Sequence, residues 1–355
     1  MTHRVQALFE RTKDLLIDCM MIYKPENVRY LSGFTGEGVL FLHKNRFVVI
    51  TDSRYTEQAL AQAPGFEILQ TAQAEFELLA QCLASVSYQR IGFEEDIVNV
   101  ATYKKLCAIA PADCYVPLGD AVTWLRAVKD EQEAAAIQKA CAITDLGFDF
   151  LTQIIRPGIT EKQISVELGY FLVKSGADGA SFSSIVASGA NGSMPHAIPT
   201  DKKIVSGELV TVDFGCLVAG YASDMTRTFA VGQVSDELKK IYGIVKQAQQ
   251  TAQNSVMPGK TGFEIDRIAR DIITEYGYGE NFEHGTGHGV GLEIHELPRL
   301  SRMAAEHVLQ PNMFVTVEPG IYIPGFGGVR VEDTVRVTPT GHESMFNSTK
   351  ELVVL

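Results

Sequence analysis

Short apolar runs separated by polar stretches fill the first third of the chain. Five of these runs have the length and composition of β-strands, at Cys19–Tyr23, Gly38–Leu42, Arg46–Ile50, Phe66–Leu69 and Arg90–Glu94. The second and third runs are joined by a polar segment that predicts a hairpin, His43–Arg46. Four further stretches predict helices, at Pro25–Leu31, Ser53–Ala63, Glu75–Val86 and Thr102–Ala110. This alternation predicts an α/β domain over residues 1–120, with a mixed sheet covered by helices.

A long amphipathic pattern begins after Lys129. Asp130 followed by Glu133 is typical of a helix N-cap with an acid at the third position. Apolar residues then recur at helical spacing, at Ala134, Ile137, Cys141, Phe148 and Leu151. The preceding segment, residues 111–129, contains two prolines and a glycine and is expected to be a connection. We therefore predict a second domain over residues 129–355.

The second domain contains an internal repeat. Three short motifs occur twice, at offsets of 101, 105 and 108 residues: Arg156–Thr160 and Met257–Thr261, Val210–Gly215 and Val315–Gly320, Asp224–Thr226 and Glu332–Thr334. Insertions in loops would produce this slow growth of the offset. Two repeats of this size predict two α/β halves with pseudo-twofold symmetry, because a solenoid needs at least three shorter units.

Composition limits the class of protein. With 46% hydrophobic and 21% charged residues, the chain is typical of a soluble globular protein. Its formal charge of −12 disfavours nucleic acid or an acidic membrane as a partner. No apolar run reaches the roughly 18 residues of a membrane span, and the polar N-terminus is expected to be a helix and not a signal peptide. The six scattered cysteines predict reduced thiols in a cytoplasmic protein.

Carboxylates occupy equivalent positions in the two repeats. Asp213 corresponds to Glu318, and Asp224 corresponds to Glu332, each in a β-rich segment where acids are disfavoured. Each repeat places its two acids on either side of a turn-like segment, so we expect them roughly opposite each other on adjacent strands. One acid in a strand would indicate an edge or a bulge. Four at related positions would repel one another unless cations held them, which predicts two metal ions.

A glycine-rich segment, Glu283–Glu296, contains three histidines among four glycines. Glycine allows close backbone approach, and histidine is the commonest transition-metal ligand. Alone, the segment would be a flexible loop with solvated histidines, but beside four carboxylates His288 becomes a candidate ligand. The zinc motif HExxH is excluded, because Pro298 follows His295 and position 299 is arginine. Nucleophile-elbow, P-loop and GxGxxG motifs do not occur in the sequence.

These residues resemble the pita-bread metallopeptidases, which include methionine aminopeptidase, Xaa-Pro aminopeptidase and Xaa-Pro dipeptidase. The resemblance runs from about Lys129 to the C-terminus. Two N-terminal motifs, Asn27–Phe34 and Thr51–Tyr55, resemble those of the proline-specific members and of creatinase. The resemblance implies an α/β (α+β) fold in which a creatinase-like N-terminal domain precedes a pseudo-twofold pita-bread catalytic domain.

The resemblance also implies a set of metal ligands. Asp213 would chelate one ion, Asp224 and Glu332 would bridge the two ions, and His288 with Glu318 would bind the other. Glu318 would also move protons during the reaction. Because this donor set is mostly hard oxygen, it favours Mn²⁺, with Co²⁺ and Zn²⁺ as alternatives.

Five further residues receive roles from the same resemblance. His196 would bind the substrate near the metal ions, and His295 would hydrogen-bond the scissile carbonyl or the intermediate. Arg330 lies beside the bridging glutamate in the sequence. His284 and Tyr322 would line a pocket for proline.

The predicted function is that of a dinuclear-metal exopeptidase that cleaves between an N-terminal residue and a following proline. The sequence leaves open whether it is an Xaa-Pro aminopeptidase or an Xaa-Pro dipeptidase, and a general metallo-aminopeptidase remains an alternative. Creatinase is disfavoured by the presence of all five ligands, and methionine aminopeptidase by the extra N-terminal domain. A non-catalytic pita-bread binding module, such as a histone chaperone, is a further alternative. The resemblance implies a homodimer that acts on small peptides.

Overall fold

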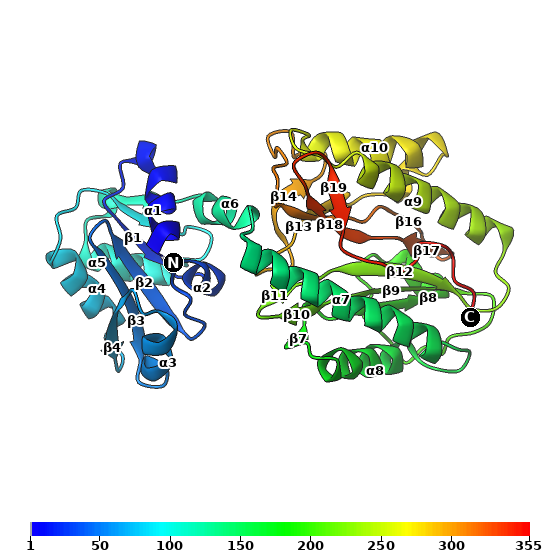
Figure 1. Ribbon diagram of the computed structural model, residues 1–355, viewed down its shortest axis with the longest axis horizontal. Coiled ribbons are helices and arrows are strands. Elements are labelled where there is room, and N and C mark those ends of the chain that lie inside the picture. Colours follow the sequence, from blue (N-terminus) through cyan, green and yellow to red (C-terminus); the bar gives the residue numbers. More distant parts are fainter. Residues whose placement is uncertain (1) are drawn as a thin grey trace. The chain divides into compact units, whose positions relative to one another are not determined.

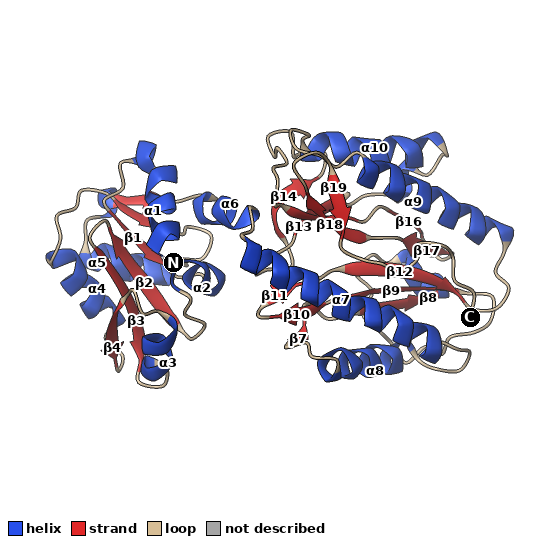
Figure 2. Cartoon of the chain, in the orientation of Figure 1, coloured by secondary structure: helices blue, strands red, loops and turns tan. Residues whose placement is uncertain are grey.

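The computed structural model describes residues 2–355. The chain divides into two compact units, one that ends at Arg126 and one that spans Ala127–Leu355. Figure 1 shows the order of the elements, and Figure 2 distinguishes the helices from the strands. Within the described residues, no helix combines the length and the apolar character that a membrane crossing requires.

A six-stranded mixed sheet forms the centre of the first unit, in the order β4-β3-β2-β1-β5-β6. Its strands are β1 (Cys19–Ile22), β2 (Gly38–His43), β3 (Arg46–Asp52), β4 (Glu67–Thr71), β5 (Ile91–Phe93) and β6 (Tyr115–Pro117). The predicted hairpin is present, because β2 and β3 are antiparallel and His43 lies opposite Arg46. All four residues of β1 are buried, which explains why this strand is a continuous apolar run in the sequence.

Helices pack against this sheet (Figure 2). They are α1 (Thr2–Arg11), α2 (Pro25–Ser32), α3 (Thr56–Gln62), α4 (Glu75–Ala84) and α5 (Val100–Ile109). Leu79 and Cys82 of α4 and Leu106 of α5 belong to one buried cluster with Met21 and Phe41 of the sheet. The mixed α/β architecture predicted for this part of the chain is therefore confirmed.

The segment 111–129, predicted to be a connection, contains regular structure. Strand β6 pairs in parallel with β5, and α6 (Ala121–Ala127) follows it. Pro117 ends an edge strand, where a missing N–H interrupts no ladder. Arg126 of α6 donates a hydrogen bond to Asn27 Oδ1 at 2.7 Å, which ties the helix to α2. The division between the two compact units, after Arg126, falls inside this segment, so the segment is a connection that contains regular structure.

The second unit consists of two similar halves, with helices on the outside and strands between them (Figure 1). The first half contributes α7 (Glu131–Ile154) and α8 (Glu161–Lys174), and the second contributes α9 (Asp236–Asn254) and α10 (Gly262–Glu275). Thr160 and Thr261, which are equivalent in the repeat, cap α8 and α10 with the same reciprocal hydrogen bonds of a capping box. The repeated motif therefore marks the same local structure twice.

Each half has an antiparallel sheet. The sheet of the first half has the order β12-β9-β8 and consists of β8 (Ile185–Ser188), β9 (Leu209–Phe214) and β12 (Met225–Ala230). The sheet of the second half has the order β14-β13-β15-β18-β19 and consists of β13 (Gly287–Gly289), β14 (Glu296–Leu300), β15 (Phe314–Val317), β18 (Asp333–Val337) and β19 (His342–Ser344).

Two smaller sheets complete the second unit. One has the order β11-β10-β7, with β7 (Gly179–Ala180), β10 (Cys216–Val218) and β11 (Tyr221–Ala222), and the other pairs β16 (Gly320–Ile323) with β17 (Gly327–Arg330). The β10–β11 turn has positive φ at both central residues, Ala219 (46°) and Gly220 (69°). Such a turn matches the right-handed twist of the strands that it connects.

The registers of the two hairpins differ in one respect that matters for the acids. In the second half, Val317 lies opposite Asp333 and Gly320 lies opposite Arg330, so Glu318 and Glu332 face each other as predicted. In the first half, Asp213 lies opposite Thr226, and Asp224 comes two residues before Thr226, on the same face of the strand. The two aspartates are thus diagonal neighbours, which corrects the expected opposite pairing.

Candidate metal centre

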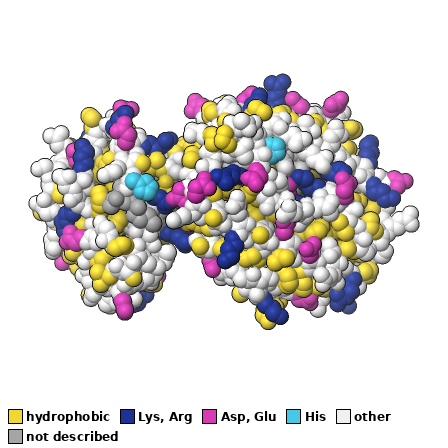
Figure 3. Space-filling view, in the orientation of Figure 1, with side chains coloured by type: hydrophobic (Ala, Val, Ile, Leu, Met, Phe, Trp, Pro, Cys, Tyr) yellow, Lys and Arg dark blue, Asp and Glu magenta, His cyan; other side chains and the backbone are white. Residues whose placement is uncertain are grey.

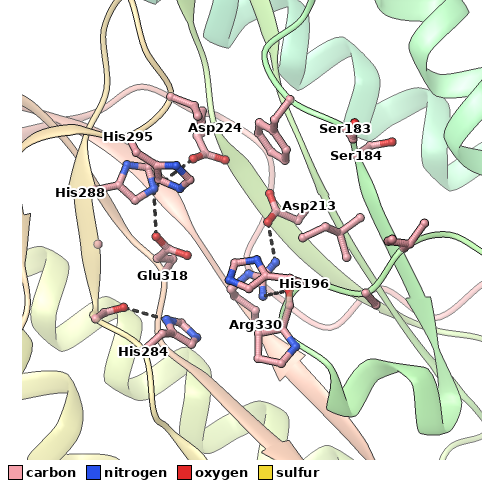
Figure 4. Close-up of a pocket in the computed structure, with 18 of the residues that line it drawn as sticks. Ser183, Ser184, His196, Asp213, Asp224, His284, His288, His295, Glu318 and Arg330 are labelled. Carbon is pink, nitrogen blue, oxygen red and sulfur yellow. Dashed lines mark hydrogen bonds and ion pairs between the residues drawn. The ribbon is translucent and has the colours of Figure 1, made fainter. Parts of the chain in front are cut away.

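A cavity of about 520 Å³ is lined by residues from both halves of the second unit (Figure 4). Eight of the predicted site residues line it: His196, Asp213, Asp224, His284, His288, His295, Glu318 and Arg330. The other two, Tyr322 and Glu332, are buried behind this lining, with 8% and 1% of their surface exposed. The structure therefore brings the predicted residues into one region.

The four acids lie at the ends of four strands, three of them in the lining of the cavity and Glu332 behind it. Asp213 lies near the end of β9, Asp224 directly precedes β12, Glu318 directly follows β15, and Glu332 directly precedes β18. Ligand atoms of Asp224, His288 and Glu332 all lie within 4.8 Å of one another. The His288 Nε2 atom is 3.2 Å from Glu318 Oε1 and 3.5 Å from Asp224 Oδ2 (Figure 4). This spacing suits a compact group of metal ligands.

The backbone around His288 sets the direction of its imidazole ring. Nδ1 forms a 3.1 Å hydrogen bond with the carbonyl of Gly289, which leaves Nε2 free to face the carboxylates. A Cβ atom on Gly287 would lie 2.0 Å from the Thr316 carbonyl oxygen, and one on Gly289 would lie 2.2 Å from that of Leu297. The glycines on either side of His288 are therefore needed because neighbouring strands approach too closely for any side chain.

Two buried carboxylate oxygens lack a hydrogen-bond partner among the described residues, Asp213 Oδ1 and Glu332 Oε1. Their companion oxygens are satisfied, because Asp213 Oδ2 accepts from Arg330 and Glu332 Oε2 accepts from Thr226 Oγ1 at 2.6 Å. A buried carboxylate oxygen without a partner is strongly unfavourable. Both oxygens belong to predicted ligands, so bound cations fit this donor set.

The electrostatics of the acids lead to the same conclusion. Burial, with repulsion from the neighbouring carboxylates, raises the pKa of Asp224 and of Glu332 well above the usual range. Burial alone would also raise the pKa of Glu318, but the hydrogen bond and charge of His288 outweigh it and lower the pKa to about 2. The raised pKa of Asp224 and of Glu332 means that their charged forms need further positive charge, which bound cations would supply.

Arg330 connects this group to the wall of the cavity. Its Nη2 atom donates to Asp213 Oδ2, and its Nη1 atom donates to the Pro195 carbonyl at 3.1 Å and to the Tyr322 hydroxyl at 2.9 Å. The arginine is 3% exposed, so these contacts fix it in one position. Arg330 therefore orients Asp213 from the wall of the cavity.

Tyr322 lies behind the lining of the cavity, next to His284. Its hydroxyl lies 2.8 Å from His284 Nε2 and accepts from Arg330, so both its polar contacts are made within the protein. The other ring nitrogen of His284 is 2.8 Å from the Gly285 carbonyl. With both nitrogens engaged, His284 presents only carbon atoms of its ring to the cavity. Tyr322 is therefore held next to the lining by His284 and Arg330, and a direct contact between Tyr322 and proline stays a prediction.

His295 and His196 lie among the more exposed residues of the lining. The His295 ring packs edge to face on His288, with 4.4 Å between ring centroids. Partial desolvation and the nearby positive groups lower the pKa of His295 to about 4, so this ring is neutral at pH 7. A neutral imidazole next to the acids can donate or accept one hydrogen bond to a bound molecule.

Arg299 is a lining residue that the sequence reasoning did not identify as functional. It is exposed, and none of the carboxylates in the described residues forms an ion pair with its guanidinium. The only sequence signal was its position eleven residues after His288, within the strand that follows the glycine-rich segment. An exposed arginine in a strand has no local pattern that separates a ligand-binding residue from a solvated one.

A carboxylate-rich centre between two repeated halves defines a metal-dependent enzyme. The chain belongs to metallopeptidase family M24, whose family model matches residues 135–339, and residues 4–128 match the Creatinase/Prolidase N-terminal domain. These matches confirm the family and the two-part fold that the sequence motifs predicted.

Proteins similar to this chain match over nearly its whole length. An Xaa-Pro dipeptidase of Pyrococcus horikoshii is 36% identical, with 99% of each chain covered. The solved structure of an Xaa-Pro dipeptidase from Bacillus anthracis is 43% identical, covers 100% of this chain and 99% of its own, and has a TM-score of 0.96. That of an X-Pro aminopeptidase from Thermotoga maritima is 35% identical, covers 97% and 100%, and has a TM-score of 0.87.

Proposed function

We propose that this metallopeptidase is a dinuclear-metal exopeptidase that hydrolyses the bond between an N-terminal residue and a following proline. The observation that carries the proposal is the convergence of four carboxylates and one imidazole, with the Asp213 and Glu332 oxygens unpaired, beside a cavity of peptide size. The names of the similar proteins, which include Xaa-Pro dipeptidases and an X-Pro aminopeptidase, support the substrate class.

In this proposal, two divalent ions are held by Asp213, Asp224, His288, Glu318 and Glu332. The mostly oxygen donor set favours Mn²⁺ over softer ions, with Co²⁺ and Zn²⁺ as alternatives. When bound, such a pair of ions supplies a nucleophilic water at neutral pH and polarises the scissile carbonyl.

The remaining residues hold the substrate and move protons. Glu318, which is ionised at neutral pH, can accept a proton during attack and return it to the leaving nitrogen. His295 can donate a hydrogen bond to the carbonyl oxygen as negative charge develops there. His196 can bind the peptide near the ions, and Arg330 keeps Asp213 in its ligand orientation.

The wall of the cavity is compatible with proline after the scissile bond. An Xaa-Pro amide has no N–H and carries a rigid ring, so its site needs apolar surface instead of a hydrogen-bond acceptor. His284 offers ring carbon atoms, and further apolar lining comes from Pro195, Ala197 and Ile198. Because an apolar slot discriminates by only about 1–3 kcal/mol per methylene, we expect real but incomplete selectivity for proline.

Arg299 favours dipeptides over longer peptides. In a dipeptide, the C-terminal carboxylate is on the proline itself, close to the scissile bond. The unpaired guanidinium of Arg299 lines the same cavity and can form a charge-assisted pair with that carboxylate. The proposal therefore takes the dipeptidase as the first candidate and the Xaa-Pro aminopeptidase as the second.

A panel of peptides with and without Mn²⁺ tests these points together. We expect kcat/KM for Ala-Pro to exceed that for Ala-Ala and for Ala-Pro-Ala, and activity to disappear with a chelator and return with Mn²⁺ or Co²⁺. Arg299→Met should lower kcat/KM for Ala-Pro by about 10- to 150-fold, as loss of a charged hydrogen bond does. Equal rates for Ala-Pro and Ala-Ala would reject proline specificity, and an unchanged rate for Arg299→Met would favour the aminopeptidase.

The proposal also covers the cellular compartment and the oligomeric state of the protein. We propose a cytoplasmic homodimer that acts on small peptides and not on nucleic acid. All six cysteines are free thiols, which suits a reducing compartment. On the face shown in Figure 3, acidic and basic side chains are interspersed, and no continuous basic surface suited to nucleic acid covers it. Measuring the mass in solution by light scattering tests the dimer.

A further inference from the structure

Glu161, the first residue of α8, is fully buried although it is charged. Its carboxylate accepts hydrogen bonds from the backbone N–H and the hydroxyl of both Ser188 and Thr200, and from Asn191 Nδ2, at 2.6–3.1 Å. All of these donors are uncharged, so no cation balances the carboxylate directly. A buried acid with so many donors serves a specific arrangement of the groups around it.

Ser188 and Thr200 lie at the two ends of one segment, and Asn191 lies between them. We name residues 188–200 the histidine loop, because this segment contains His196. Its residues from Pro195 to Pro199 line the cavity. Glu161 binds the start of the loop through Ser188 and its end through Thr200. One carboxylate thus fixes both ends of the segment that carries a site histidine.

The middle of the histidine loop has separate contacts with the second half of the unit. Arg330 donates to the Pro195 carbonyl at 3.1 Å. Gly192 packs against Gly328, and a Cβ atom added to Gly192 would lie 3.0 Å from the Gly328 nitrogen. The histidine loop is therefore held by Glu161 at its ends and by Arg330 and Gly328 at its centre.

We propose that Glu161 is a positioning residue that holds His196 against the peptide substrate through the histidine loop. The proposal rests on the proposed function, because it assigns peptide binding to His196. Glu161 is not among the residues that line the cavity, so it acts only through other groups. A simple role in starting α8 does not explain it, because Thr160 and Gln163 already cap this helix.

Glutamine at this position makes a sharp test, because it has almost the same shape as glutamate. One carboxylate oxygen would become an amide nitrogen, which donates hydrogen bonds and cannot accept them. That nitrogen would face either Ser188 or Thr200, whose donors would lose their partner. One end of the histidine loop would then lose its contact with the Glu161 side chain, while the backbone pairing of Ser188 with Val210 and of Thr200 with Lys162 would remain.

The experiment compares Glu161→Gln with Gln163→Ala in the metal-loaded enzyme, using Ala-Pro as substrate. Gln163→Ala is the matched control, because it removes the side-chain half of the capping box of α8, keeps the bond from the N–H of residue 163 to Thr160 Oγ1, and leaves the contacts of Glu161 intact. We expect Glu161→Gln to lower kcat/KM at least about tenfold, mainly through KM, with unchanged metal content. We expect the control to change kcat/KM less than about twofold, since it perturbs only the start of the helix.

A double-mutant cycle with His196→Ala separates positioning from general stability. If Glu161 acts through His196, then Glu161→Gln should have an effect of less than about twofold once His196 is alanine. Equal losses in both backgrounds, or loss of metal in Glu161→Gln, would overturn the proposal. If Glu161→Gln does not fold, Thr200→Val takes its place in the cycle, because it removes one donor at the end of the loop. The expected outcomes are the same. A wild-type enzyme inactive on Xaa-Pro peptides would instead reject the proposed function.

Discussion

The two halves of the second unit each anchor a histidine-bearing segment to a buried acid on their second helix, but with different chemistry. In the first half, Glu161 on α8 accepts only from uncharged groups of the histidine loop. In the second half, Asp266 on α10 accepts from the N–H and hydroxyl of Thr286, both at 3.0 Å, and forms an ion pair with Arg270 at 2.9 Å.

Arg270 adds further hydrogen bonds between α10 and the segment that contains His284 and His288. It donates to the Phe282 carbonyl at 2.6 Å and to the His284 carbonyl at 2.8 Å, just before the ligand candidate His288. The buried acid that has its own cation, Asp266, therefore supports the segment proposed to bind metal, and the buried acid without one, Glu161, supports the segment proposed to bind substrate. The comparison shows that the same scaffold, used twice, holds one histidine-bearing segment with a buried ion pair and the other with uncharged hydrogen-bond donors.

The largest expected effect comes from removing one bridging carboxylate from each half. Asp224→Ala and Glu332→Ala should both lose metal and activity, by more than the roughly 10- to 100-fold that supporting residues of metal sites cost. The measurements are metal content by mass spectrometry and kcat/KM for Ala-Pro. Asp333→Asn is the control, because Asp333 faces Arg227 at 2.8 Å and not the cavity. If one ligand variant kept its metal while the other lost it, the halves would not share the centre.

The next effect concerns His295, which we propose to contact substrate and not metal. His295→Ala should lower kcat by about 10²–10³, as loss of one oxyanion donor typically does, while both ions stay bound. Steady-state kinetics together with metal content per protein chain gives the answer. Release of metal with a normal rate per occupied site would show that His295 is a structural support of the second half.

A smaller effect compares the two buried acids, Asp266 and Glu161. Asp266→Asn should weaken Mn²⁺ binding by about 10- to 100-fold, because it loosens the segment that leads to His288. KM measured at saturating Mn²⁺ should change little, in contrast to Glu161→Gln. Equilibrium dialysis against Mn²⁺ provides the affinity. Should Asp266→Asn raise KM at full metal occupancy instead, the division of labour between the halves would be wrong.

The smallest effect is on stability as a function of pH. Burial would raise the pKa of Glu161, but hydrogen bonds from Thr200 and Ser188 outweigh it and lower the pKa below the usual 4.5. The stabilisation is therefore complete above about pH 4.5 and is lost as the pH falls through the folded pKa. The difference in Tm between wild type and Glu161→Gln should shrink between about pH 5 and pH 3. A difference that grows on acidification would contradict the lowered pKa.

Local and repeated features of this chain could be predicted from the sequence. The capping box of α7 was recognised because Asp130 and Glu133 are only three residues apart. The acids were found because each occurs twice in equivalent motifs, which made a chance arrangement implausible. The glycines beside His288 were interpreted correctly as sites of close backbone approach.

Features set by distant contacts could not be predicted. The offset between Asp213 and Asp224 depends on a strand register that a one-residue change would alter without changing the pattern of acids. Glu161 gave no signal, because the residues that it binds lie 27–39 positions further along the chain. The burial of Tyr322 likewise depends on Arg330 and His284, which bind its hydroxyl from two other segments.

The spacing of the repeat has a consequence for the order of folding. Asp213 and Glu318 are 105 residues apart in the chain, so they meet only after the two halves have docked. Contacts of such high sequence separation form late, because the loop between them must first be closed. Neither half alone presents more than two of the four carboxylates. The uptake of metal ions therefore reports that folding is complete, and ions that bind only the native chain shift the equilibrium away from partly folded forms.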